Sequence, residues 1–283
     1  VNDTLWTELT ESRKNLNNHL LKNLNPTGVP IELKGSNIPI KFNNLKELEK
    51  TINSNNLAAL IVEPGRFNYM KKNVAKRINY LCKKNKICLI VDEITCGWRS
   101  NLGGLYKKIG LKPDIVIYGK ALGNGYAISS VVGKKKYLEH ANKSFISSTA
   151  WTEKVGFSAA LATIKILRKK KFNKIKILSN LIKEYWEHYS KKYNINITIN
   201  NYSSIPSFNF NYGKKNDELY TFYTNFYLKR NILASNAIYL SFAHSKENIK
   251  PYLKSLDLLF YEINEYLSKN KKMSKKYTRK YNY

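Results

Sequence analysis

The sequence has few cysteines and no long apolar run, and both gaps exclude classes of protein. Its three cysteines, Cys82, Cys88 and Cys96, form no CxxC pair and are odd in number, so neither a disulfide framework nor a zinc site is indicated. A reducing cytosol fits this cysteine usage. No apolar run approaches the roughly 18 to 20 residues of a membrane span, and the N-terminus lacks a secretory signal pattern. We therefore expect a cytoplasmic protein with no membrane segment and no metal.

Acidic residues are also scarce, with 20 Asp and Glu against 49 Lys and Arg, which gives a formal net charge of +29. Such an excess is typical of proteins that meet nucleic acid or an anionic surface. The lysines are spread along the chain rather than gathered on one motif, so we interpret them as solvated charge. We expect no specific nucleic-acid partner; a protein that binds through its charge alone is the alternative.

Several short apolar runs are each followed at once by a polar residue or a glycine, which is typical of buried strands in a parallel sheet. Helical patterns at residues 42–53 and 73–85 alternate with them, and residues 103–112 are long enough for a crossover. This order predicts an α/β fold with a mostly parallel sheet and flanking helices. The expected strands are residues 57–62, 87–91, 115–118 and 127–133, and for the last of them an antiparallel direction is open. A long helix rich in small residues is expected at 154–170.

The second half of the chain predicts a smaller α+β lobe. We place a large domain at residues 1–170, a small C-terminal domain at 171–268, and a basic tail, expected to be disordered, at 269–283. Before the first strand we expect irregular structure after a short helix at 5–16. The expected elements of the small domain are strands at 193–200, 207–212 and 238–242 and helices at 217–229 and 246–267.

A carboxylate and an amine follow two neighbouring strands of the predicted sheet. Asp92 ends one run and Lys120 follows the next, at the carboxyl ends where open α/β sheets hold ligands. An amine that becomes a Schiff base must be able to lose its proton, and a pyridine cofactor needs an anion opposite its ring nitrogen. Asp92 and Lys120 could fill these roles, or Asp92 could simply cap the next helix. A nucleotide site is not indicated, because GKALGNG has its lysine before its glycines and no GxGxxG follows a strand.

Several separate runs carry a family resemblance. These are LIVDEITCGWR, PDIVIYGKALGNGYAISSVVG and FISSTAWTEKVGFSAALATI, with LAALIVEPGR upstream and LASNAIYLSFAHSKENIKPYL downstream. Together they resemble the class III aminotransferases of the fold type I pyridoxal-phosphate enzymes, above all the glutamate-1-semialdehyde 2,1-aminomutase-like branch. The resemblance covers nearly the whole chain. It implies pyridoxal 5'-phosphate as cofactor, a homodimer with the active site at the subunit interface, and a small amino or keto compound as substrate.

The resemblance also implies a role for each matching residue. Lys120 matches the lysine of the internal aldimine, Asp92 the carboxylate under the pyridine nitrogen, and Ile94 the apolar side chain against the ring face. Thr149 matches the threonine that reaches the cofactor phosphate of the partner subunit. Glu63 matches a glutamate close to the active site, with a structural carboxylate at a strand end as an equal alternative.

Three further residues of the matching runs are interpreted as structural. Glu93 and Arg99 belong to the motif around Asp92, and we expect both to stabilise the fold. His244 is expected to be a fixed core histidine of the small domain rather than a catalyst.

The implied chemistry is a transamination half-reaction, run as an aminotransferase or as an aminomutase, and the sequence does not separate the two. A different fold type I chemistry, such as aldol cleavage or decarboxylation, is less well supported because of the SST loop and the Ala-rich helix after it. The resemblance places a phosphate-binding loop of small residues and a ring-stacking aromatic residue upstream of Val1. No SGSE-like run or Tyr-His-Gly segment replaces them. The large domain is therefore expected to be incomplete, and a catalytically inactive truncated remnant is the alternative to an enzyme.

Overall fold

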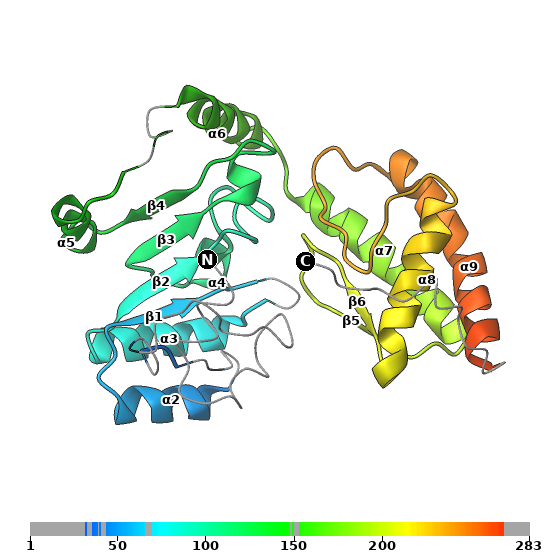
Figure 1. The fold of residues 1–283 in the computed structure, drawn as a ribbon, viewed down its shortest axis with the longest axis horizontal. Coiled ribbons are helices and arrows are strands. Elements are labelled where there is room, and N and C mark those ends of the chain that lie inside the picture. The colour runs from blue at the N-terminus through cyan, green and yellow to red at the C-terminus, as the bar shows by residue number, and fades with distance from the viewer. Residues whose placement is uncertain are drawn as a thin grey trace.

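The computed structural model describes residues 32, 36–38, 40, 44–65, 69–147, 149 and 153–268. Two lobes lie side by side, one with a four-stranded sheet and helices α2 to α6, the other with a two-stranded sheet and helices α7 to α9 (Figure 1). The helix predicted at residues 5–16 and the tail at 269–283 lie outside the described residues.

The larger sheet has the strand order β1-β2-β3-β4. Its first three strands are parallel, and the last is antiparallel to β3, so the mostly parallel sheet with an antiparallel strand at its edge is confirmed. Val62, Val91 and Val116 share one row of the register, which brings the carboxyl ends of β1, β2 and β3 to the same edge. The strands are β1 (Ala59–Val62), β2 (Cys88–Asp92), β3 (Ile115–Tyr118) and β4 (Ser130–Gly133).

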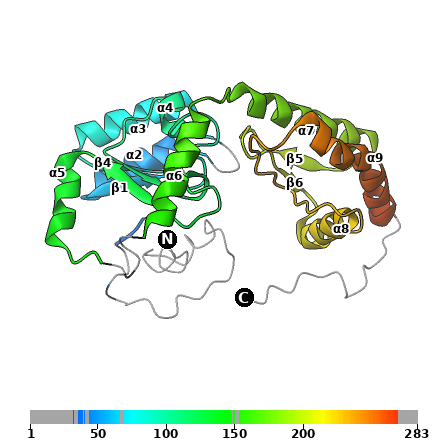
Figure 2. The same cartoon turned by 90° about the horizontal axis from the view of Figure 1, so that it is seen from above.

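Amphipathic helices cover this sheet. Leu48 and Ile52 of α2 and Ile78 of α3 are buried in one core cluster with Leu89 and Val91 of β2. Seen from above, α3 and α4 lie on one side of the sheet and α6 on the other (Figure 2). The helices of the larger lobe are α2 (Leu45–Ser54), α3 (Lys72–Lys84), α4 (Leu105–Ile109), α5 (Lys135–Leu138) and α6 (Lys154–Leu167).

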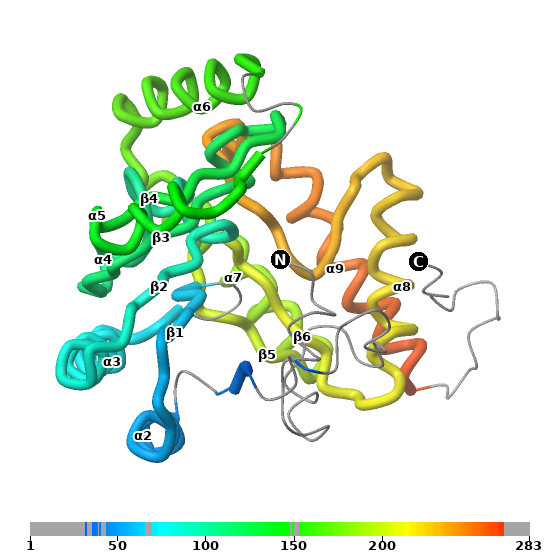
Figure 3. The backbone as a smooth tube through the Cα atoms, turned by 60° about the vertical axis from the view of Figure 1, so that its left-hand side comes forward, coloured from blue at the N-terminus to red at the C-terminus, as the bar shows by residue number. Residues whose placement is uncertain are grey.

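The smaller lobe packs three helices against a short hairpin. The strands β5 and β6 are antiparallel and lie between the larger lobe and the helices α8 and α9 (Figure 3). At its centre the Trp186 Nε1 donates to the Tyr252 hydroxyl at 2.6 Å, and this hydroxyl also lies 2.6 Å from the Tyr223 hydroxyl. The elements are α7 (Asn173–Lys192), β5 (Ile197–Ile199), β6 (Phe208–Phe210), α8 (Asn216–Leu228) and α9 (Lys246–Ser268).

Two elements of this lobe differ from the prediction. Helix α7 was not predicted, although its buried residues Ile175, Leu178, Ile182 and Trp186 follow helical spacing. The strand predicted at 238–242 is wrong. Main-chain N–H groups of this segment donate to carbonyls of residues 204 and 206, but Pro206 has no N–H to donate in return, so a regular ladder does not form.

The division into domains at residues 170 and 171 stays a prediction. Most core residues fall into separate clusters, one in each lobe. Tyr202 and Ile205, however, belong by sequence to the predicted small domain and are buried in the core cluster of the larger lobe. The chain therefore returns to the larger lobe between β5 and β6.

The buried hydrogen bonds of Tyr252 give a stability prediction. Tyr252→Phe removes the hydroxyl that contacts Trp186 and Tyr223, so a buried indole N–H and a buried phenol both lose a partner. We expect the free energy of unfolding, measured by urea denaturation, to fall by about 1–3 kcal/mol. Tyr261→Phe is the matched control, because Tyr261 lies on the same helix and is exposed. An equal loss in both variants would contradict this role for Tyr252.

Candidate functional site

The structure brings three of the predicted site residues to the carboxyl edge of the larger sheet. Glu63 follows β1, Asp92 is the last residue of β2, and Lys120 is separated from the end of β3 only by Gly119. Asp92 pairs with Ile117 in the register, so β2 and β3 deliver their polar residues next to each other. This is the edge at which parallel sheets hold ligands.

Asp92 is half-buried and starts the turn that follows β2. Its Oδ1 accepts a hydrogen bond from the Ile94 N–H at 2.8 Å, and no other hydrogen bond to its carboxylate comes from the part of the chain that the structure describes. Ile94 lies beside Gly119, where an added Cβ would come within 3.5 Å of Ile94 Cγ2. The apolar side chain therefore borders the backbone that leads into Lys120.

Lys120 begins a single turn of 3₁₀ helix, Lys120–Leu122, with a φ of 44°. Residues other than glycine seldom adopt this left-handed conformation, and it is often found at functional sites. The Lys120 Nζ donates to Thr95 Oγ1 at 3.1 Å, and Thr95 is buried. The turn is closed by Gly123, where a Cβ would lie 2.1 Å from the Tyr126 carbonyl oxygen, so no larger residue fits.

Glu93 has the structural role that we expected. It is fully buried, and its carboxylate accepts hydrogen bonds from the Tyr106 N–H at 2.6 Å and from the Cys96 thiol at 3.0 Å. Gly104 leaves room for this carboxylate, because a Cβ there would lie 2.7 Å from it. Burial raises the pKa of the Glu93 carboxyl above its usual value. Glu93 thus ties the turn after β2 to the start of α4.

Arg99 ends the same turn and reaches the smaller lobe. Its Nε donates to the Thr95 carbonyl oxygen at 2.8 Å, and its guanidinium lies 5.2 Å from the ring centroid of Tyr239. Burial lowers the pKa of Arg99. Next to it, the Trp98 Nε1 is buried and has no hydrogen-bond partner among the described residues.

A cavity of about 670 Å³ opens beside Lys120 and Arg99. The larger lobe contributes residues 98–99, 120–121 and 124–127 and the end of α6, and the smaller lobe contributes Ile175 and the segment 240–243. None of its described lining residues is an Asp or Glu. Sequence reasoning missed the contribution of segment 240–243, because no local pattern shows that a distant loop packs against the turn at Arg99.

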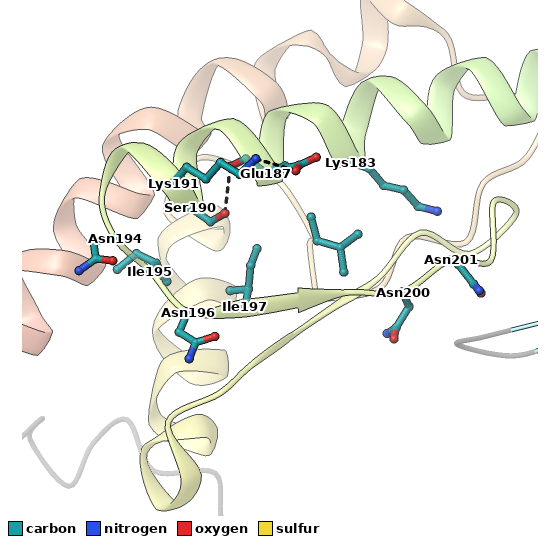
Figure 4. Close-up of a pocket in the computed structure, with 11 residues that line it drawn as sticks. Lys183, Glu187, Ser190, Lys191, Asn194, Ile195, Asn196, Ile197, Asn200 and Asn201 are labelled. Carbon is teal, nitrogen blue, oxygen red and sulfur yellow. Dashed lines mark hydrogen bonds and ion pairs between the residues drawn. The ribbon is translucent and has the colours of Figure 1, made fainter.

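A second cavity, of about 780 Å³, lies in the smaller lobe between α7 and β5 (Figure 4). Here Glu187 is paired with Lys191 at 2.8 Å, and Ile197 faces the helix. Burial lowers the pKa of Lys183. None of the predicted site residues lines this cavity. We therefore take the cavity beside Lys120 as the candidate functional site.

Two other predicted residues are placed differently. Thr149 is exposed in a turn, with residues 148 and 150–152 outside the described range, and among the described residues no hydrogen bond joins it to Asp92 or Lys120. Its role toward a partner subunit stays a prediction. His244 is only half-buried, and its Nδ1 lies 3.1 Å from both the N and the Oγ of Ser241. The expectation of a core histidine is wrong, because a surface turn and not the lobe's core holds its ring.

The chain belongs to the class-III aminotransferases, whose family model matches residues 11–221. This confirms the resemblance seen in the sequence. The chain is 28% identical over 254 residues to glutamate-1-semialdehyde 2,1-aminomutase of Ruminiclostridium cellulolyticum, covering 81% of this chain and 58% of that protein. It is 34% identical over 151 residues to 3-aminobutyryl-CoA aminotransferase of Cloacimonas acidaminovorans, covering 50% of this chain and 36% of that protein.

The fold matches a solved structure of the Sphingopyxis sp. MTA144 FumI protein, which was determined in its PLP internal aldimine form. The TM-score is 0.74 at 19% identity, over 86% of this chain and 61% of that one. The predicted fold type I architecture is thereby confirmed. The chain spans about half the length of these relatives, at 58%, 36% and 61%.

Two further findings concern the described residues as a whole. No helix among them is long and apolar enough to cross a membrane. They also contain no group of three or more His, Cys, Asp or Glu residues placed to hold a metal ion.

The buried Glu93 gives a prediction about pH. Its raised pKa means that the folded protein binds this proton more tightly than the unfolded chain, so stability falls as pH rises from about 4, the usual Glu pKa, through the folded value. Glu93→Gln cannot titrate, so we expect the wild type to lose more free energy of unfolding than the variant between pH about 4 and 7. Urea denaturation across that range measures the difference. Glu139→Gln, at an exposed position, controls for the loss of one carboxylate, and parallel wild-type and Glu93→Gln profiles would disprove the expectation.

Proposed function

We propose that this chain carries the amine and carboxylate groups of a pyridoxal-phosphate-dependent aminotransferase or aminomutase that acts on a small amino or keto compound. The single observation that supports this most directly is the placement of Lys120 and Asp92 at the ends of adjacent parallel strands, on the edge of a class-III aminotransferase fold. The cavity next to Lys120 supplies room for a small substrate.

The residues present fit this cofactor at two of its groups. Asp92 offers a half-buried carboxylate of which Oδ2 accepts no hydrogen bond from any described residue, so it can face a protonated ring nitrogen. Lys120 offers an exposed primary amine in reach of the same edge, and Ile94 offers an apolar surface beside it. When bound, pyridoxal phosphate supplies an electron sink for a carbon that loses its proton.

The chain's own residues position the amine and its proton. Thr95 Oγ1 accepts a hydrogen bond from the Lys120 Nζ. Because Thr95 is buried, this bond orients the amine toward a fixed partner. The strained backbone at Lys120 is held by the turn that Gly123 closes. Lys120 is then the group that accepts a proton from the substrate carbon and returns it, as a general base and acid. Glu63, which follows β1, adds a further carboxylate to the same edge of the sheet.

Aminotransferase and aminomutase are both supported, because relatives of each name match the chain. An aminomutase returns the nitrogen to a neighbouring carbon of the same molecule and needs no second substrate. An aminotransferase requires an amino acceptor. Turnover with and without an added keto acid would therefore separate them in the complete enzyme.

We also propose a homodimer. The edge strand β4 exposes both Val131 and Val132, and α6 exposes Phe157 and Leu161 one turn apart. An edge strand and an apolar helix face left open to water are typical of surfaces that another chain covers. A second copy of this chain is the partner that the family resemblance implies.

The dimer can be tested by placing a charge on α6. We expect Leu161→Glu to shift the chain toward monomer in sedimentation velocity, because burying a carboxylate in an apolar interface is unfavourable. Leu233→Glu is the matched control, since Leu233 is exposed in the smaller lobe. A wild type that is monomeric at all concentrations, or a variant that associates like the wild type, would sink the proposal.

The amine assignment is tested by borohydride trapping. We expect pyridoxal phosphate and borohydride to attach the cofactor to Lys120 in preference to the other lysines, as measured by peptide mass spectrometry, because Lys120 follows the strand next to that of Asp92 and lines the cavity. Lys120→Ala should lose this adduct, while Lys134→Ala, which removes an amine paired with Asp114, should keep it. Labelling spread evenly over the lysines would favour the inactive remnant.

A further inference from the structure

We propose that Arg99 anchors a carboxylate of the substrate and so determines specificity in the cavity beside Lys120. This inference relies on the proposed function only where it names Lys120 as the reacting amine. The binding of an anion by Arg99 does not depend on it. It gives Arg99 a role beyond the structural one that its sequence motif indicated.

The guanidinium of Arg99 is held in place without being neutralised. One of its N–H groups donates to the Thr95 carbonyl, and its central carbon lies 5.2 Å from the ring centroid of Tyr239. No described Asp or Glu forms an ion pair with it. Arg99 is half-buried and has therefore lost part of its hydration. The remaining N–H groups of its planar guanidinium are held in one orientation, which suits the bidentate binding of a carboxylate.

The cavity around Arg99 favours an anion. Arg99 and Lys120 both line it, and no acidic residue is among its described lining. These two cations border a space whose described lining has no carboxylate, and such a space attracts negatively charged molecules.

Arg99 and Lys120 are linked through a single residue. The Thr95 carbonyl accepts from Arg99, and the Thr95 hydroxyl accepts from Lys120. The two cationic groups therefore share one hydrogen-bond partner and line one cavity. A molecule whose amine or carbonyl end meets Lys120 would place a carboxylate a few bonds away against Arg99, which selects amino and keto acids over neutral amines.

The test measures anion binding to the unmodified full chain by titration calorimetry, with glutarate as the probe and its uncharged diamide, glutaramide, as the comparison. We expect glutarate to bind and glutaramide to bind much more weakly. Arg99→Gln should weaken glutarate binding about tenfold or more, since it removes a charge-assisted pair of hydrogen bonds. Arg99→Lys should fall between the two, because it keeps the charge and loses the fork.

Arg230→Gln is the matched control. Arg230 also stacks on an aromatic ring, 3.5 Å from the Phe226 centroid, and donates to a main-chain carbonyl, but it does not line the cavity. We expect this variant to bind glutarate as the wild type does. Equal binding by wild type and Arg99→Gln, or equal binding of glutarate and glutaramide, would overturn the proposal.

A second measurement needs no variant and so does not depend on Arg99→Gln folding. Phenylglyoxal modifies arginine side chains, and we expect glutarate to protect Arg99, but not Arg77, from modification as mapped by mass spectrometry. Absence of protection would contradict the anchor. If glutarate protects Arg99 but borohydride does not trap the cofactor on Lys120, the anion site is supported and the proposed function is refuted. If trapping succeeds but glutarate does not protect Arg99, only the role of Arg99 as a carboxylate anchor is refuted.

Discussion

Parallel pairing of β2 with β3 is the constraint on which the site depends. The register that sets Asp92 opposite Ile117 leaves Gly119 and Lys120 to emerge just beyond the end of the neighbouring strand. Shifting one strand by a single residue would turn the alternate, core-facing side chains such as Val91 and Val116 to the wrong face. The apolar packing that fixes the strands therefore also fixes the distance between the carboxylate and the amine.

The turn from Asp92 to Arg99 follows β2 and carries the side chains that contact Lys120 and line the cavity. Glu93 anchors its start beneath α4, and Thr95 stands at its centre with one hydrogen bond to each of two cationic side chains. Burial raises the pKa of the Glu93 carboxyl, and the hydrogen bonds that it accepts from Tyr106 and Cys96 hold the turn from the interior. The turn presents its outward groups to the cavity on the other side.

Local patterns predicted the larger lobe and the strand-end residues well. A short, buried, β-branched run predicts a strand from its own residues, because its apolar character and its length are local properties. One such run ends at Asp92, and another is followed by Gly119 and Lys120. Helix α7 was not predicted although the spacing of Ile175, Leu178 and Ile182 is helical, because the basic residues just before them, from Arg168 to Lys174, resemble the solvated background of the whole chain. The strand expected at 238–242 was wrong because its partner contains Pro206, which only the tertiary pairing reveals.

The cavity could not be predicted, because it is made by contacts between distant segments. Arg99 meets Tyr239 across the lobes, and the hydroxyl of Tyr202, on the segment between β5 and β6 that returns to the larger lobe, donates to the Cys96 carbonyl at 3.2 Å. Two segments from the second half of the chain therefore contact the turn. Both points of contact lie within four residues after Thr95, which accepts a hydrogen bond from Lys120. Any change in the position of the smaller lobe would therefore act on the amine and on the cavity wall together, which couples the shape of the substrate site to the orientation of Lys120.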